Sequence, residues 1–177
     1  MKSIYAFFKK FLDIIKIIED TICIIGTWIC SILIFVAVIN RYFLHFEIMW
    51  FNDLALYFFI FYIMFSIVIT TRDDSHTALD VFKIKLFRKN YKAGIVYSIF
   101  LRTISFIVVF IFGTVAYKFM LRAIKYPEFG TLVRWFNESW LHSLLFFIII
   151  LILIYIFELI LKDINQLQKI DTKTGGK

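Results

Sequence analysis

Four apolar runs occupy most of the chain, at residues 21–39, 54–71, 95–116 and 141–161. Each is close to the roughly 20 residues that an α-helix, rising about 1.5 Å per residue, needs to cross about 30 Å of hydrocarbon. Lipid offers the backbone no hydrogen-bond partner, so a spanning segment must be a helix or part of a closed barrel, and continuous apolar runs exclude the barrel. The sequence predicts an all-α membrane protein with four transmembrane helices.

Composition supports a lipid environment over a soluble fold. Hydrophobic residues make up 62% of the 177 residues, with 23 Phe, six Gly and one Pro, which leaves little material for turns and polar surfaces. The formal charge of +7 comes from basic residues between and beside the apolar runs. Such a distribution is explained by membrane topology, and we expect no nucleic-acid partner.

The basic residues also predict orientation. Lys and Arg are concentrated on one side of the predicted membrane. Fourteen lie before the first run, between the second and third, or after the fourth, and five lie in the other two connections. The positive-inside rule places both termini in the cytoplasm. We expect a four-helix transmembrane domain at residues 21–162 and a cytoplasmic tail at 163–177.

Residues 1–20 carry an apolar stripe at steps of three and four, formed by Ile4, Phe8, Phe11, Ile15 and Ile18. Charged residues occupy another face, so we expect an amphipathic helix at the cytoplasmic membrane surface. The alternative is a frayed extension of the first span. Trp50, Trp135 and Trp140 lie near outward ends of spans and are expected to be interfacial anchors, whereas Trp28 is expected to pack against another helix.

Arg102 is a charged residue inside the third apolar run. Inserting Arg near the centre of a spanning helix costs about 2.5 to 3.5 kcal/mol, so it needs a partner or a route to water. Glu158 lies near the cytoplasmic end of the fourth run, and we expect an Arg102–Glu158 ion pair between the two helices. The alternative is that each side chain reaches the headgroups separately.

Two polar segments flank the second run. The segment before the run contains Arg41, Trp50 and Asp53. The segment at its end contains Arg72, His76 and Asp80, each four residues from the next. A continuing helix would place these three residues along one face. A hydrogen-bond cluster that fixes the bend after the span is favoured over a proton relay, because the groups lie at the membrane edge.

Together these segments resemble the small membrane subunit of tripartite ATP-independent periplasmic (TRAP) transporters, the DctQ-like family, over nearly the whole chain. Members have an Arg-Tyr pair ending the first span, a Trp followed by acidic residues before the second, and a cytoplasmic His with a following Asp. The matching positions here are Arg41 and Tyr42, Trp50 and Asp53, and His76 and Asp80. Where the family often has two adjacent acids, this chain has Asn52 and Asp53.

The resemblance implies a subunit of the bacterial inner membrane that supports a larger transport subunit. A periplasmic binding protein would deliver an organic acid for sodium-coupled uptake. Substrate and sodium sites would lie in the large subunit, leaving this chain without catalytic residues, cofactor or metal, and membrane lipids would surround it.

A membrane anchor for a redox enzyme is the alternative, since four-helix subunits can hold haem between paired His ligands. The chain offers only His45, His76 and His142 for this, none deep within a span. A self-contained channel or intramembrane enzyme is disfavoured, because the spans lack a line of polar residues and a nucleophile with a base.

Overall fold

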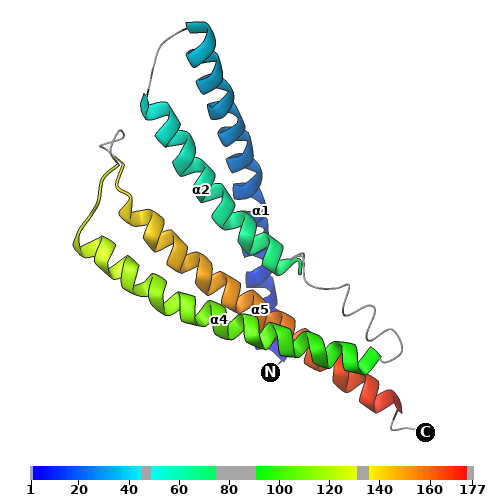
Figure 1. Cartoon of the computed structure of the whole chain (residues 1–177). Coiled ribbons are helices and arrows are strands. Elements are labelled where there is room, and N and C mark those ends of the chain that lie inside the picture. The colour runs from blue at the N-terminus through cyan, green and yellow to red at the C-terminus, as the bar shows by residue number, and fades with distance from the viewer. Residues whose placement is uncertain (1, 45–48, 75–90, 131–135, 175–177) are drawn as a thin grey trace. The chain divides into compact units, whose positions relative to one another are not determined.

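The computed structural model describes residues 2–44, 49–74, 91–130 and 136–174. The described elements are α1 (Lys2–Ile39), a π-helical turn η1 (Asn40–Leu44), α2 (Met49–Arg72), α4 (Tyr91–Lys125) and α5 (Ser139–Thr174), shown in Figure 1. Four helices in these ranges are long and apolar enough to cross a membrane, with candidate spans at Asp13–Phe43, Asp53–Arg72, Lys92–Lys125 and Ser139–Ile170. The predicted four-helix membrane fold is thereby confirmed.

The helices extend beyond the apolar runs that predict them. Helix α1 runs unbroken from Lys2, so residues 2–20 and the first span form one helix. Helix α5 continues to Thr174, through most of the predicted tail. An apolar run marks only the part of a helix that lipid can cover, and a polar continuation retains its backbone hydrogen bonds in water. The interfacial position of the N-terminal part and the cytoplasmic location of the termini stay predictions.

The chain forms two compact units. The first comprises Met1–Ile69 and Phe119–Leu145, and the second comprises Thr70–Lys118 and Phe146–Lys177. Each unit combines stretches that are distant in sequence, so each has its own helix packing.

In the first unit, a glycine allows α1 and α2 to approach closely. A Cβ built on Gly26 would lie 3.2 Å from the Cβ of Tyr62. Glu19 and Cys30 are buried on the same side of α1 as Gly26, being seven residues before it and four after. Small residues at a helix contact permit the close packing that holds helices together in lipid.

The second unit packs α4 against α5. A Cβ on Gly113 would lie 3.3 Å from Cγ2 of Ile149, and the rings of Tyr117 and Phe146 lie 5.4 Å apart. Ile148 and Tyr155, seven residues apart on α5, are only 2% and 1% exposed. This spacing places both on one helix face, which forms the core of the unit.

The connection between α4 and α5 has backbone structure of its own, in the first unit. Phe129 and Asn137 form an isolated antiparallel bridge. The N–H of Gly130 donates to the carbonyl of Phe136 over 3.1 Å, and that of Glu138 donates to the carbonyl of Glu128 over 2.9 Å. The Asn137 side chain then accepts the N–H of Ser139 at 2.9 Å, which satisfies an otherwise free donor at the start of α5.

Candidate functional site

Arg102 on α4 is the centre of an ion cluster in the second unit. Its Nη2 donates to Oδ2 of Asp74 over 2.6 Å. Its Nη1 donates to the carboxylate of Asp163 and, over 3.1 Å, to the carbonyl of Leu159. We call Arg102, Asp74, Asp163 and the Leu159 carbonyl the Arg102 cluster. The guanidinium has several donors in a fixed plane, which lets one side chain link three segments.

Burial differs across the Arg102 cluster. The side chains of Arg102 and Asp163 are 17% and 13% exposed, whereas that of Asp74 is 57% exposed. The pair from α4 to α5 is therefore largely shielded from solvent, and its charge-assisted hydrogen bond is worth more than a surface ion pair. The arrangement holds α4, α5 and the turn after α2 together.

Asp74 reaches Arg102 because of the way α2 ends. The helix stops at Arg72, and Asp74 has a left-handed backbone with φ of 53°. Its N–H donates to the carbonyl of Thr71 over 3.2 Å, which closes the last turn. Asp is one of the few residues other than Gly that tolerate this conformation, so it serves both as helix terminator and as ion partner.

The expected Arg102–Glu158 pair is corrected by this geometry. Glu158 instead pairs with Lys162 at 3.1 Å, one turn along α5. Asp163 lies five residues beyond Glu158, on another face of the same helix. Arg102 and its partner helix were predicted, but Asp163 was assigned to the cytoplasmic tail, outside the predicted four-helix domain, and so was not considered as a partner.

A second group of contacts surrounds Tyr57 on α2, within the first unit. Its hydroxyl donates to Oε1 of Glu138 over 2.7 Å. Its ring stacks on Phe136 with centroids 4.3 Å apart and 14° between the planes, and Phe136 contacts Trp140 at 5.6 Å. We call Tyr57, Phe136, Glu138 and Trp140 the Tyr57 cluster. It ties the start of α5 to α2.

The Tyr57 cluster was not predicted. A tyrosine inside an apolar run is a usable signal, because a buried hydroxyl needs a hydrogen-bond partner. Glu138 lies 81 residues further along the chain, and nothing in the local sequence pairs the two. Trp140, 54% exposed, remains a predicted interfacial anchor.

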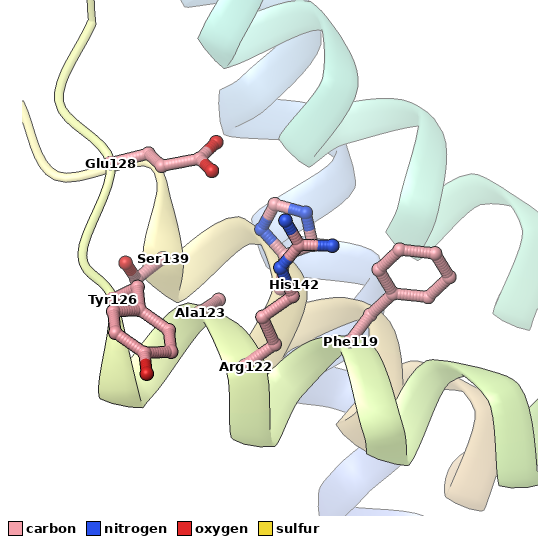
Figure 2. Close-up of a pocket in the computed structure, with 7 residues that line it drawn as sticks. All are labelled: Phe119, Arg122, Ala123, Tyr126, Glu128, Ser139 and His142. Atoms are coloured by element: carbon pink, nitrogen blue, oxygen red, sulfur yellow. The ribbon is translucent and has the colours of Figure 1, made fainter.

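A small cavity of about 160 Å³ lies where α4 ends and α5 begins, again within the first unit. Figure 2 shows the side chains that line it. They are Phe119, Arg122, Ala123, Tyr126, Glu128, Ser139 and His142.

The residues that carry the family resemblance are spread along the chain. Arg41 lies 5.9 Å from the ring centroid of Tyr42, which is 66% exposed. Trp50 contacts the ring of Phe51 at 5.0 Å, and Asp53 is partly buried. Arg72 bonds the adjacent Asp73 at 2.9 Å. The other predicted residues, His76, Asp80 and Trp135, lie outside the described residues, as does His45.

Among the described residues, no group of three or more His, Cys, Asp and Glu could hold a metal ion. The two ion and hydrogen-bond clusters join helices, and the spans present apolar surface. These features define a multi-pass helical membrane protein whose described polar clusters join its helices.

Residues 30–166 match the family described as tripartite ATP-independent periplasmic transporters, DctQ component. The match covers more than half of the chain, so the protein belongs to the DctQ family, the small membrane component of TRAP transporters of the inner membrane. The predicted family is confirmed. No curated protein matches the chain in sequence. The tripartite system implies a large membrane partner and a periplasmic binding protein.

Proposed function

We propose that this chain is the stationary membrane scaffold of a TRAP transporter. A large partner subunit moves an organic acid with sodium, and this chain braces it. The chain has no catalytic role and no cofactor of its own, and sodium binds the partner. Family membership supports the assignment to the transporter, and it gives the redox-anchor alternative no support.

The observation that carries the scaffold role is an uncovered apolar face on α1. Ile25, Trp28, Ile32 and Phe35 follow one another at steps of three and four and are 52%, 68%, 56% and 65% exposed. We call these four residues the outer face of α1. They lie opposite Gly26 and Cys30, which face the interior of the first unit.

Trp28 distinguishes this face from ordinary lipid-facing surface. Its position in the first apolar run predicts packing against another helix, but within this chain the Trp28 side chain is 68% exposed. Trp in membrane proteins favours the headgroup level, where its N–H is solvated, yet Trp28 is near the middle of the Asp13–Phe43 span. A ring at that depth is accounted for by contact with a protein partner. We assign the outer face of α1 to the large transport subunit.

The two clusters fit a bracing role. The Arg102 cluster fastens α4 to α5 and to the end of α2 in the second unit. The Tyr57 cluster fastens α2 to the start of α5 in the first unit. Each cluster stiffens the unit that contains it, and a stiff surface is what a moving partner requires as a fixed reference.

The outward connections are proposed to contact the binding protein. With both termini in the cytoplasm, residues 47–53 and 118–140 face the periplasm. The second of these contains the bridged connection from Glu128 to Glu138, whose paired backbone gives a docking protein a defined surface.

Co-purification tests the scaffold assignment. The chain, carrying an affinity tag, is co-expressed with the large TRAP membrane subunit of the same cell, and the recovered large subunit is quantified. Trp28→Ala should lower recovery at least several-fold, because an aromatic anchor in a packed interface contributes about 2 kcal/mol or more. Phe112→Ala is the matched control, since Phe112 on α4 is 66% exposed and lies outside the outer face of α1. Equal recovery with both variants would contradict the assigned face.

A further inference from the structure

The cavity at the junction of α4 and α5 is lined by groups of opposite charge. Arg122 belongs to the last turn of α4, and Glu128 to the connection that follows. Figure 2 shows Arg122 and His142 among the residues that line the cavity from the two helices, with the Glu128 carboxylate pointing toward the same space from the connection. The cavity therefore presents a cationic wall and an anionic wall.

These charges are not used to neutralise each other. Among the described residues, neither Arg122 nor Glu128 forms an ion pair, in contrast to Arg102 and Glu158, which do. His142 is oriented by the backbone, because its Nδ1 lies 3.3 Å from the carbonyl of Glu138. The guanidinium of Arg122 and the carboxylate of Glu128 thus remain available to a bound group.

The lining also limits the size and polarity of a ligand. A volume of about 160 Å³ is several times the roughly 30 Å³ that one water occupies, so it holds a group of several heavy atoms. Phe119 and Tyr126 add aromatic surface on the α4 side. A dianion would meet the Glu128 carboxylate, and a simple cation would meet Arg122. Neither ligand satisfies both walls.

We propose that this cavity binds a phosphate ester that carries a primary ammonium, the phosphoethanolamine group. The phosphate is paired with the Arg122 guanidinium, and the ammonium donates to the Glu128 carboxylate. Guanidinium matches phosphate geometry by bidentate hydrogen bonding, and an ammonium donates up to three hydrogen bonds to a carboxylate.

A lipid headgroup is the source that fits the position of the cavity. Arg122 and Phe119 lie in the last two turns of the Lys92–Lys125 span, where an apolar helix reaches the headgroup level. Phe119 is 52% exposed one turn before Arg122, so its ring offers apolar surface that an acyl chain can contact. Soluble phosphoethanolamine has the same charged groups, and the experiment must separate the two sources.

Native mass spectrometry of the full chain in detergent provides the test. Phosphatidylethanolamine and phosphatidylglycerol with identical acyl chains are added at equal concentration, and the bound fractions are compared. Phosphatidylethanolamine should bind about tenfold more tightly, since one charge-assisted hydrogen bond contributes about that factor. Glu128→Gln should bring the two lipids to equal binding, whereas Arg122→Gln should weaken both. Lys118→Gln, one turn before Arg122 and outside the cavity, should change neither.

The controls keep the test decisive. Circular dichroism must show unchanged helicity in each variant, and Arg122→Lys and Glu128→Asp should retain part of the preference. Soluble phosphoethanolamine is then added as competitor: weak displacement assigns the site to the lipid, and displacement at equal concentration assigns it to the soluble compound. An ethanolamine preference that survives Glu128→Gln, or phosphatidylethanolamine binding that survives Arg122→Gln, would overturn the proposal. Neither result depends on the scaffold role.

Discussion

Asp74 and Arg102 are joined by a 2.6 Å ion pair that links the turn after α2 to the body of α4. The same guanidinium bonds Asp163 and the Leu159 carbonyl on α5, so one side chain serves three segments of the second unit. The contribution of these bonds to stability can be separated by substitution, because the partners differ in burial.

Asp163→Asn should destabilise the chain more than Glu158→Gln. The Asp163 side chain is 13% exposed, and loss of its charge should lower the free energy of unfolding by about 1 to 3 kcal/mol. Glu158, 28% exposed, pairs along the same helix with Lys162, which is 62% exposed, and loss of this i,i+4 pair should cost about 0.5 kcal/mol or less. Thermal unfolding in detergent compares the two, and equal losses would show that the Arg102 cluster does not stabilise the fold.

Arg102→Met should be partly rescued by a second substitution, Asp163→Leu. The single variant leaves a largely buried carboxylate without its cation, which costs about 3 kcal/mol, whereas the double variant removes both charges. Arg102→Lys should recover only part of the stability, since one ammonium cannot reproduce the planar set of donors. A double-mutant cycle compares the unfolding temperatures of the unsubstituted chain, Arg102→Met, Asp163→Leu and the double variant. Strictly additive losses would argue against direct coupling of Arg102 and Asp163.

Tyr57→Phe should loosen the connection before α5 while preserving the ring stack. The substitution removes the 2.7 Å bond to Glu138 but keeps the contact with Phe136, so a loss of about 1 kcal/mol is expected. Hydrogen exchange should rise at the amides of Gly130 and Glu138, which bond across the connection. Tyr42→Phe is the control, because Tyr42 is 66% exposed. Unchanged exchange in Tyr57→Phe would mean that the backbone bridge holds the connection without the hydroxyl.

Gly26→Ala should be more damaging than Gly113→Ala. The new Cβ at position 26 would meet the Cβ of Tyr62 at 3.2 Å, close to the α2 backbone, whereas that at position 113 would meet the terminal Cγ2 of Ile149 at 3.3 Å. Crowding against backbone-proximal atoms forces helices apart, at a cost of about 1 to 3 kcal/mol. Thermal unfolding measures both variants. A greater loss at position 113 would indicate that the α4–α5 packing is the less adaptable contact.

The four helices could be predicted because hydrocarbon imposes one strong requirement, an apolar run of sufficient length. How far the last helix continues past the fourth run could not, because residues 163–174 lack the apolar periodicity that marks residues 1–20. The error at Asp163 followed directly, since a carboxylate placed in a tail is not considered as a partner for Arg102.

The candidate site was predicted in part for a related reason. Arg102 was identified because a charge in an apolar run needs a partner. Predicting Asp74 as a partner would have required knowing the left-handed turn that ends α2. Predicting the Tyr57–Glu138 bond would have required knowing the fold of the connection before α5. Contacts between distant segments depend on backbone geometry that no local pattern encodes.

Uptake by proteoliposomes tests the scaffold role most directly. The large transport subunit is reconstituted with and without this chain, in the presence of the binding protein, an inward sodium gradient and the labelled organic acid. We predict uptake only when both membrane subunits are present, and none from vesicles that contain this chain alone. Undiminished uptake by the large subunit without this chain, or selective flux through this chain alone, would contradict the account.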